Sequence, residues 1–329
     1  MNKKHEKSAC CRAKIIKYGR RRRQCVSCRK TWRVWKCARG RKKKRVNHNL
    51  VKAFLNRETI AISKRAEKRG QSESTLQDAL RKSRDAFLLH EPYAPIPRGD
   101  LIMVADAVIE LIKGRWVTTY LMLLRSVSGN VAVILPPFFR RGTETWEGWS
   151  EAFETIPETA QIRIKALVCD GHVGLVGEAK EKRWVLGRCH FHLLARIQSR
   201  RSLSFIARNK KEAEIIFLHV RTILYGRNEQ SILTSLNVIE EIGWISSSPT
   251  IRTTLSGFVK HYEDYRTYLE YPDLHLPTTN NTAESLASLI GNLKYKLKGF
   301  KTEASLKSWI SALLKFRKRM KCNGFYQPN

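Results

Sequence analysis

The spacing of hydrophobic residues changes near residue 100, and this change predicts two regions of different structure. Between residues 46 and 90, apolar positions recur every three to four residues, which is the period of an amphipathic helix. We predict three helices in this region, at Asn49–Leu55, Thr59–Arg69 and Thr75–Arg84. After Asp100 the apolar residues instead form short continuous runs, which are typical of buried strands.

The runs after Asp100 predict three strands in succession, followed by strands that alternate with helices. The turn at Ser128–Asn130 favours an antiparallel meander, which Pro136 and Pro137 end. The order strand, strand, strand, helix, strand, helix, strand is that of the ribonuclease H fold, so we expect an α/β protein with a ribonuclease H-like core. The predicted elements are Leu101–Ala105, Arg115–Val127, Asn130–Leu135, the helix Thr143–Ile156, the strand Ile162–Cys169, the helix Gly174–Ala179 and the strand Trp184–Gly187.

Helical spacing returns over residues 193–270, where no acidic residue stands at the end of a strand. We predict an α-helical insertion there, with helices at Leu193–Ile206, Lys210–Leu224, Asn228–Ile242 and Thr250–Leu269. Repeated prolines at residues 91–99 predict a linker, because proline blocks both helices and sheet ladders. The expected domains are a basic head at 1–45, a helix-turn-helix at 46–90, the linker at 91–99 and a catalytic domain at 100–329 that contains the insertion at about 193–270.

The three helices before the linker fit a helix-turn-helix. Thr59 is a plausible N-cap, Gly70 breaks the second helix in a left-handed turn, and Ser72 or Ser74 opens the third. Leu76, Ala79 and Leu80 are then expected to face the core. A plain helical hairpin is the alternative, but the basic head just upstream favours DNA recognition. The exposed face of the third helix would then enter a major groove with Ser74, Thr75, Gln77, Asp78 and Arg81.

The charge of the chain points to a polyanionic partner. The formal net charge is +33, from 62 Lys and Arg against 29 Asp and Glu, and residues 1–45 hold 20 basic residues with one acid, Glu6. Nucleic acid is the simplest partner for such a bias. No apolar run is long enough for a membrane span, and the first residues lead into no apolar signal core. We therefore expect a cytoplasmic, nucleoid-associated protein without a membrane partner.

Cysteines in the head indicate a zinc site. Five of the eight cysteines lie between Cys10 and Cys37. The spacing Cys25-x-x-Cys28 puts two thiolates on one tight turn, as tetrahedral zinc requires. A zinc ribbon needs a second pair of ligands, and here Cys10 and Cys11 are adjacent. The candidates for the fourth ligand are either of these two cysteines, His5 and Cys37. A ribbon that has lost its metal is the alternative.

Arginine runs in the head are expected to bind the DNA backbone. They comprise Arg20, Arg21, Arg22 and Arg23, and a second basic run at residues 41–45. Each phosphate that they neutralise releases counterions, so the affinity of residues 1–90 for DNA should fall steeply with salt.

Two aspartates stand where a ribonuclease H-like sheet would bring them together. Asp106 is expected at the end of the first strand, and Asp170 just after the fourth. Carboxylate oxygens suit Mg²⁺, and a pair of such ions about 3.5–4 Å apart supports phosphodiester chemistry. Glu110 is the chief rival for Asp106, and we expect Asp100 to be a strand-start residue.

A third carboxylate is predicted downstream of the insertion. Asn281 or Thr282 can cap a helix, which places Glu284 in its first turn. Glu284 is then either a third metal ligand or only a partner in the capping interaction. The residues taken alone favour neither.

Cys189 and His192 lie one turn apart at an expected helix start. They could share a metal, but two ligands alone do not make a structural zinc site. We therefore expect them to fix the strand-to-helix junction beside Asp170. Cys169 and Cys322 are expected to be packed residues.

Together these features resemble the bacterial insertion-sequence transposases of the Asp-Asp-Glu type, in the Mutator-like group. The matching pieces are Asp106, the segment Asp170–Leu175, the pair Cys189-x-x-His192 and the segment Thr279–Glu284. The resemblance implies a ribonuclease H-like core whose acids are Asp106, Asp170 and Glu284. It also implies Mg²⁺-dependent cleavage and transfer of DNA strands at terminal inverted repeats, with Mn²⁺ as a substitute ion, by a self-associating protein.

Two other functions fit part of the sequence. A non-catalytic, sequence-specific DNA-binding regulator derived from a transposase fits the head and the helix-turn-helix, but all three acids are present. An RNA-binding protein fits the basic charge and leaves the acids unexplained. We therefore expect a DNA transposase that acts on double-stranded transposon ends and target DNA.

Overall fold

The computed structural model describes residues 10–18, 22–33, 48–56, 60–202, 207–246 and 248–322. Contacts between residues divide the chain into two units, Met1–Asn47 and His48–Asn329, and each unit is described by itself. None of the helices in the described ranges has the length and apolar character that crossing a bilayer requires.

The first unit contains a three-stranded antiparallel sheet. Its strands are β1 (Ile15–Lys17), β2 (Arg22–Cys25) and β3 (Thr31–Arg33), paired in the order β1-β2-β3. Among the residues of this unit whose burial is described, only Cys25 is buried. A sheet of this size has almost no apolar core, so something other than hydrophobic burial must stabilise it.

The second unit begins with three helices, as predicted. They are α1 (His48–Leu55), α2 (Ile62–Lys68) and α3 (Glu73–His90). Gly70 has a φ of +58°, in the left-handed region expected for the turn. Ser72 is the N-cap of α3, and its hydroxyl accepts a hydrogen bond from the backbone N–H of Thr75. The N-cap of α2 is Ala61, and Thr59 lies outside the described residues.

These helices pack against the C-terminal helices of the same unit. The ring of Phe54 in α1 lies 5.3 Å from the ring of Trp309 in α13 (Glu303–Arg317). Lys296, in α12 (Asn281–Lys296), donates to the backbone carbonyls of Phe54 and Asn56 at 3.2 and 2.8 Å. The side chain of Lys296 therefore satisfies carbonyls at the C-terminal end of α1.

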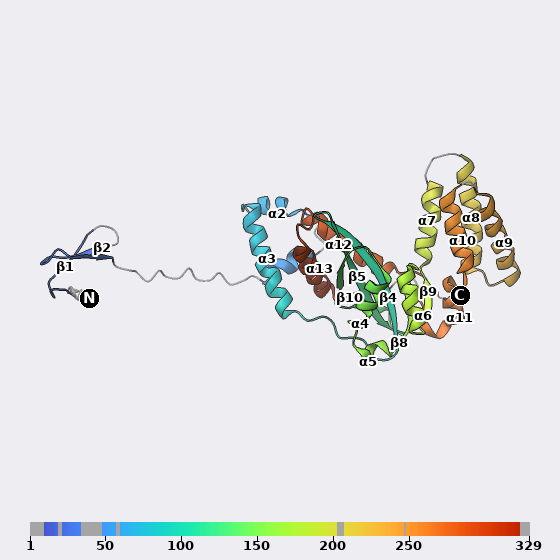
Figure 1. The fold of residues 1–329 in the computed structure, drawn as a ribbon, viewed down its shortest axis with the longest axis horizontal. Coiled ribbons are helices and arrows are strands. Elements are labelled where there is room, and N and C mark those ends of the chain that lie inside the picture. The colour runs from blue at the N-terminus through green and yellow to red at the C-terminus, as the bar shows by residue number, and fades with distance from the viewer. Residues whose placement is uncertain are drawn as a thin grey trace. The chain divides into compact units, whose positions relative to one another are not determined.

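A mixed sheet forms the centre of the second unit (Figure 1). The strand order is β10-β6-β5-β4-β8-β9, and β7 pairs with β5 beside this path. The first three strands are an antiparallel meander, while β8 and β9 run parallel to β4. The strands are β4 (Leu101–Ile112), β5 (Arg115–Ser126), β6 (Val131–Ile134), β7 (Phe138–Arg141), β8 (Ile164–Cys169), β9 (Val185–Arg188) and β10 (Arg319–Lys321).

Two details of this sheet differ from the prediction. Asp106 lies within β4 and not at its end, because β5 is equally long and pairs with β4 from Leu101 to Ile112. Strand β7 was not predicted, since Pro136 and Pro137 were expected to end the meander. The chain resumes pairing with β5 directly after these prolines, with Phe139 opposite Thr119.

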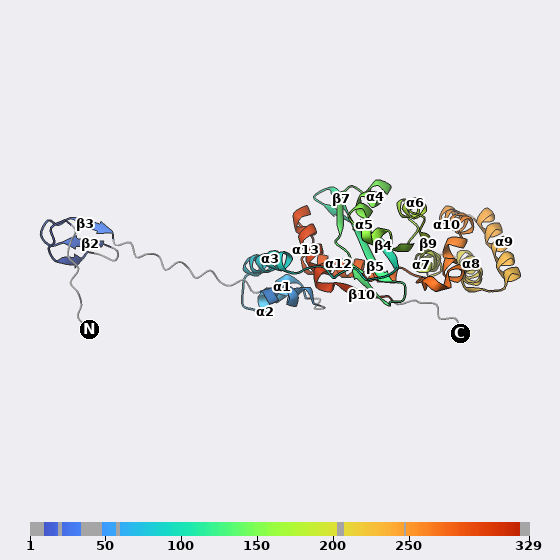
Figure 2. The same cartoon turned by 90° about the horizontal axis from the view of Figure 1, so that it is seen from below.

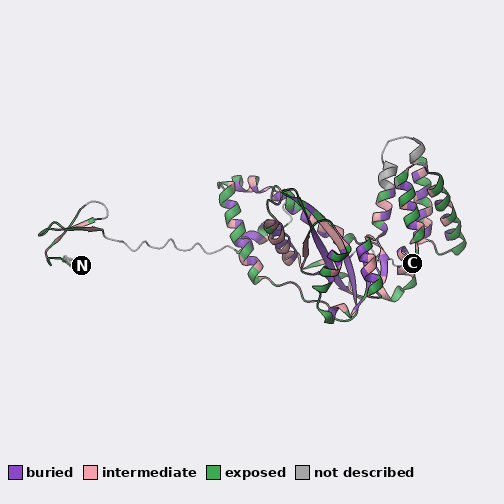
Figure 3. Cartoon of the chain, in the orientation of Figure 1, coloured by how far each residue is buried: buried purple, intermediate pink, exposed green. Residues whose placement is uncertain are grey.

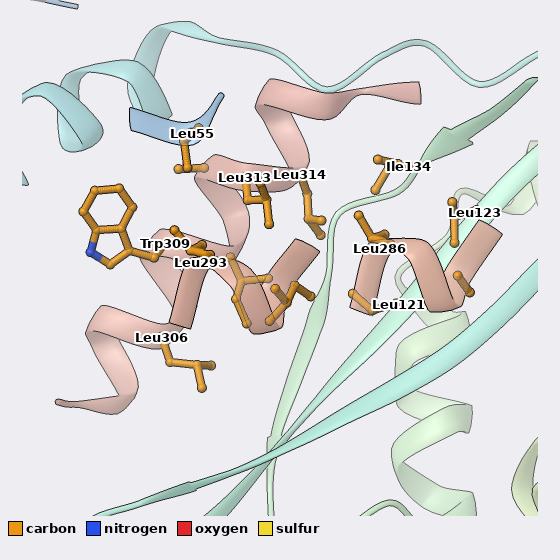
Figure 4. Close-up of a cluster of buried hydrophobic side chains, with 14 of the residues drawn as sticks. Leu55, Leu121, Leu123, Ile134, Leu286, Leu293, Leu306, Trp309, Leu313 and Leu314 are labelled. Atoms are coloured by element: carbon orange, nitrogen blue, oxygen red, sulfur yellow. The ribbon is translucent and has the colours of Figure 1, made fainter. Parts of the chain in front are cut away.

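Side chains on the two faces of the sheet enter two separate cores. Ile102 and Val104 of β4 pack with α12 and α13, whereas Leu101 and Met103 pack with α4 (Trp146–Glu154) and α6 (Val173–Glu181). This alternation follows from the two-residue period of a strand. Figure 2 shows the helices α4 and α6 on one side of the sheet, with the short α5 (Glu158–Gln161) near them. Figure 4 shows part of the other core, including Leu121, Leu123, Ile134, Leu286, Leu293, Leu313 and Leu314.

Arg125 is a fully buried cation in β5. Its guanidinium donates to the carbonyls of Ser126, Val127 and Gly129 in the following turn, and to that of His275 far along the chain. Burial lowers the pKa of Arg125 to about 10. The side chain therefore joins the β5–β6 turn to the segment that precedes α12.

Helices make up most of the described residues between β9 and α12. The principal ones are α7 (His190–Ser202), α8 (Ala207–Tyr225), α9 (Glu229–Ile245) and α10 (Pro249–Lys260). They share a core of their own, which includes Ile197, Val220, Ile239 and Leu255. Figure 3 shows this buried interior together with the exposed outer faces of the helices. The short helices η1 (Glu263–Tyr265), α11 (Thr267–Glu270) and η2 (Pro272–Leu274) return the chain toward α12.

Candidate functional site

Four cysteines of the first unit form a cluster that could hold a metal such as zinc. The sulfur atoms of Cys10, Cys11, Cys25 and Cys28 all lie within 4.8 Å of one another. Cys10 and Cys11 would point in different directions if they stood on a strand, because successive side chains alternate. They lie in a turn instead, and both thiols reach the cluster. The other two candidates for the fourth ligand, His5 and Cys37, lie outside the described residues.

Tight turns shape both halves of the cysteine cluster. After Cys25, the N–H of Arg29 donates back to the Cys25 carbonyl at 3.0 Å, and Arg29 has a φ of +58°. Arg12, just after Cys11, has a φ of +51°. Hydrogen bonding with Cys28, then desolvation and hydrogen bonding with Cys10, raise the pKa of Cys11 to about 12, which favours its protonated thiol when no cation is bound. A divalent metal reverses this preference, because a coordinated thiol is deprotonated.

The predicted DNA-contacting residues are exposed wherever the structure describes them. Arg22 is exposed on β2 and Arg23 is partly exposed, whereas Arg20 and Arg21 lie outside the described residues. On α3 the side chains of Ser74, Thr75, Gln77 and Arg81 are exposed, and Leu76 and Leu80 are buried, as expected. Both surfaces are therefore accessible to a ligand.

The two predicted aspartates stand on neighbouring parallel strands. Val104 of β4 pairs with Val168 of β8. The same register, carried two residues further, sets Asp106 beside Asp170 on the same face of the sheet. Side chains on that face of β4 and β8 pack toward α12. Glu110, the rival of Asp106, is instead paired with Lys294 of α12 at 2.6 Å.

A sharp turn presents the carboxylate of Asp170. Its Oδ1 accepts a hydrogen bond from the backbone N–H of His172 at 2.9 Å. Gly171 between them has a φ of +92°, and a Cβ there would lie 3.2 Å from the guanidinium of Arg188. Only glycine fits this turn without strain.

Glu284 approaches the aspartates from the first turn of α12. The N-cap of this helix is Asn280, one residue earlier than predicted, and its side chain makes no capping hydrogen bond. The Glu284 carboxylate does not cap the helix either. Its Oε1 lies 3.4 Å from Nδ1 of His192 and 3.8 Å from Sγ of Cys189.

The carboxylates act on one another electrostatically. The pKa of Asp106 is raised to about 7, first because burial disfavours its charged form and then because of the charges of Asp170, Glu144 and Glu284. Burial and Asp170 also raise the pKa of Glu284, against the influence of His192 and Cys189. Within the described residues, neither Asp106 nor Asp170 forms an ion pair with a basic side chain. The cluster therefore concentrates negative charge that a cation would stabilise.

Glu144 is a fourth acid of this cluster that the sequence analysis missed. Its Oε1 accepts a hydrogen bond from Nε1 of the buried Trp149 at 2.7 Å and lies 3.4 Å from Nδ1 of His172. Burial and the charge of Asp170 raise the pKa of Glu144, while Trp149 and His172 lower it. The predicted helix Thr143–Ile156 included Glu144 in its first turn. In the structure α4 begins at Trp146 with Thr145 as N-cap, so Glu144 stands in the loop just before the helix.

Close helix packing fixes the position of Glu144. Gly148 of α4 lies so close to Tyr120 that a Cβ would stand 1.9 Å from the tyrosine oxygen. Gly174 of α6 approaches the backbone of Trp146, where a Cβ would stand 2.9 Å from the tryptophan Cα. These two glycines allow α4 to pack on both the sheet and α6. The loop that carries Glu144 is thereby held next to the turn after Asp170.

Chemically, the second unit presents two different sets of donors side by side. Asp106, Asp170 and Glu144 offer only hard carboxylate oxygens, which suit a hard divalent cation. Cys189 and His192 offer a sulfur and a nitrogen. Glu284 lies against this second pair and interacts electrostatically with the aspartates. Cys169 and Cys322 are buried and packed, as predicted.

Comparison with known proteins adds no family assignment: no protein-family model and no curated protein matches the chain. The function must therefore be inferred from the residues and their geometry.

Proposed function

We propose that this chain is a DNA transposase of the Asp-Asp-Glu type, similar to the Mutator-like insertion-sequence enzymes. The observation that carries the proposal is the electrostatic coupling of Asp106 in β4, Asp170 just after β8 and Glu284 in α12. Glu284 stands 114 positions after Asp170 in the sequence, yet the charge of each raises the pKa of Asp106. Acids whose pKa values are raised by burial and by one another are typical of functional sites.

The strand order supports a ribonuclease H-like core. An antiparallel meander, β4-β5-β6, is joined on its β4 edge by the parallel strands β8 and β9. This is the arrangement expected from the sequence, with a helical insertion between the second aspartate and the final glutamate. The fold by itself does not define a function, so the proposal depends on the acids.

Asp106, Asp170 and Glu284 would hold two Mg²⁺ ions, and the type of donor fits because all three offer carboxylate oxygens. The described groups whose ligand atoms all lie within 4.8 Å of one another do not include these three acids, so the side chains would have to move closer to bind the ions. When bound, such ions activate the attacking oxygen and stabilise the leaving oxygen of a phosphodiester. The chain itself positions the carboxylates: β4 and β8 fix the aspartates, and the Gly171 turn orients Asp170. Glu144 adds negative charge beside them.

DNA binding would involve surfaces outside the carboxylate site. The exposed face of α3 offers Ser74, Thr75, Gln77 and Arg81 for base contacts in a major groove. The first unit offers Arg22 and Arg23 for phosphates, with zinc in the cysteine cluster to stabilise its turns. Double-stranded transposon ends and target DNA are the proposed partners, with a self-associated enzyme.

The test is a cleavage assay with the full-length protein, Mg²⁺ and the DNA that flanks its gene. Asp106→Asn, Asp170→Asn and Glu284→Gln should each lower cleavage by at least about a thousandfold, since each removes a metal ligand, and leave DNA binding intact. Glu110→Gln is the matched control, because this acid lies on the same strand but is paired with Lys294. Undiminished cleavage by the Asp170 variant would overturn the proposal. DNA binding without any cleavage by the unaltered protein would favour the regulator.

A further inference from the structure

The beginnings of α7 and α12 meet at a buried junction next to the carboxylate site. The backbone N–H of His190 donates to the carbonyl of Thr278 at 2.9 Å, and the N–H of Asn280 donates to Sγ of Cys189 at 3.3 Å. The N–H of Cys189 in turn donates to the carbonyl of Cys169 at the end of β8. Three segments that are distant in the sequence are therefore held together around the Cys189 side chain.

Three different donor atoms converge at this junction. Sγ of Cys189, a ring nitrogen of His192 and a carboxylate oxygen of Glu284 all lie within 4.8 Å of one another. Cys189 immediately precedes α7 and His192 stands in its first turn, so the i, i+3 spacing brings both side chains to one face. Glu284 comes from the first turn of α12.

The distances at the junction are close to those between two ligands of one metal ion. Nδ1 of His192 lies 3.4 Å from Oε1 of Glu284, beyond the usual range of 2.7–3.2 Å for an N–H···O bond. Sγ of Cys189 lies 3.8 Å from the same oxygen. Around a tetrahedral zinc ion, N···O and S···O edges of about 3.3 and 3.6 Å follow from the usual zinc–ligand bond lengths. The observed separations are therefore close to the edges of such a tetrahedron.

Unsatisfied polar atoms at the same junction provide a second, independent observation. Asn280 is fully buried, yet neither atom of its side-chain amide has a hydrogen-bond partner in the described part of the chain. The same holds for Nδ1 of His192 and Oγ1 of Thr279. Buried polar groups are nearly always paired, and exceptions point to an ion or an ordered water. A metal ion with a bound water would offer partners of both kinds.

We propose that Cys189, His192 and Glu284 bind one zinc ion, which joins the start of α7 to the start of α12 and holds one carboxylate oxygen of Glu284. The combination of thiolate, imidazole and a single carboxylate selects zinc over Mg²⁺, which prefers oxygen ligands alone. Burial raises the pKa of Cys189 to about 11, so zinc binding displaces one proton from this thiol. A water completes the tetrahedron.

Zinc at the junction would orient Glu284 for the adjacent site. Both contacts of its carboxylate at the junction involve Oε1. The other oxygen, Oε2, can then serve a metal held by the aspartates. The zinc ion would also fasten the helical insertion to the sheet where the insertion begins. The proposal adds a metal to the transposase proposed above but does not depend on DNA cleavage.

The experiment measures zinc bound to the purified full-length protein. The unaltered chain should hold one zinc ion in the cysteine cluster and a second at the junction. Cys189→Ser combined with His192→Asn should lose one equivalent, and Cys25→Ser combined with Cys28→Ser should lose the other. Cys322→Ser is the matched control, because Cys322 is also a buried free cysteine but lies outside both clusters. Equal zinc contents in the unaltered protein and the junction variant would overturn the proposal.

Cobalt(II) provides a second readout that separates metal binding from misfolding. The Cys25→Ser, Cys28→Ser protein keeps the junction intact, so Co²⁺ should give it a tetrahedral absorption spectrum with a thiolate charge-transfer band. Adding His192→Asn should abolish this spectrum while circular dichroism stays unchanged. No tetrahedral spectrum in the first protein would exclude the site. Zinc at the junction without any cleavage of DNA would instead contradict only the proposed transposase.

Discussion

The cysteine cluster of the first unit and the carboxylate cluster of the second are supported in different ways. Around the cysteines, only Cys25 is buried among the described residues, and three short strands form the whole sheet. Asp106 instead stands on β4 and Asp170 directly after β8, and residues of these two strands are buried on both faces of the sheet. The first cluster has turns but almost no core, whereas the second rests on two hydrophobic cores.

This difference indicates whether metal binding or hydrophobic burial stabilises each unit. In the first unit, four thiols converge without enough apolar surface to hold them, so a metal would supply most of the folding free energy. In the second unit, hydrophobic burial already fixes the strands, and the charges of Asp170, Glu144 and Glu284 disfavour the ionised form of Asp106. A metal would there be a consequence of the fold and not its cause.

Removing metal should have the largest effect and should affect the two units differently. A structural zinc site contributes about 10–16 kcal/mol to binding and folding, which the first unit cannot replace. Treating the full-length protein with a strong chelator should make residues 10–33 sensitive to protease, while residues 100–190 stay resistant. Limited proteolysis with mass spectrometry checks this outcome. Continued protection of residues 10–33 in the metal-free protein would show that the small sheet folds without zinc.

The stability of the second unit should depend on the buried cation Arg125 and not on a metal. Arg125→Met removes the donor for four backbone carbonyls, and the unfolding free energy should fall by about 3 kcal/mol or more, because buried acceptors lose their partners. Denaturant unfolding followed by tryptophan fluorescence measures the change. Arg115→Met, at the exposed start of the same strand, is the control and should be nearly neutral. An equal loss in both variants would contradict the role assigned to Arg125.

The smallest effect should come from substituting Glu144. This variant tests whether Glu144 binds the metal directly or only adds negative charge beside the metal ligands. Glu144→Gln keeps an acceptor for Trp149 but removes one negative charge from the cluster. The Mg²⁺ concentration for half-maximal cleavage should rise about tenfold, equivalent to about 1.4 kcal/mol, with little change in maximal rate. Glu147→Gln, an exposed acid in the first turn of α4, should have no effect. A complete loss of cleavage would make Glu144 a direct ligand.

Much of the architecture followed from hydrophobic spacing. The three N-terminal helices, the meander and the parallel strands appear where the periodicity predicted them, because burial on one or both faces leaves a clear pattern. Strand β7 escaped prediction because two prolines precede it. The extent of β4 beyond Asp106 also escaped, since only the length of its partner β5 determines where that strand ends.

Some candidate site residues could likewise be predicted from the sequence, and others could not. Asp106 and Asp170 could be predicted as candidate metal ligands because each is attached to a strongly apolar strand. Cys25-x-x-Cys28 could be predicted as a candidate zinc site because its spacing matches zinc geometry. Glu144 could not, since the sequence placed it in the first turn of a predicted helix, where acids are common for reasons other than metal binding. Its role depends on how closely Gly148 and Gly174 allow α4 to approach its neighbours.

Local features of the sequence account for the basic charge, for the order of helices and strands, and for the acids and cysteines on which the functional hypothesis depends. These are local properties, because periodicity, spacing and residue chemistry act over short stretches of chain. Only the tertiary structure decided that Cys10 and Cys11 both reach the cysteine cluster, that Glu144 joins the aspartates, and that Glu284 meets Cys189 and His192. Those contacts join residues far apart in sequence or depend on turn geometry, and packing of the whole domain fixes them.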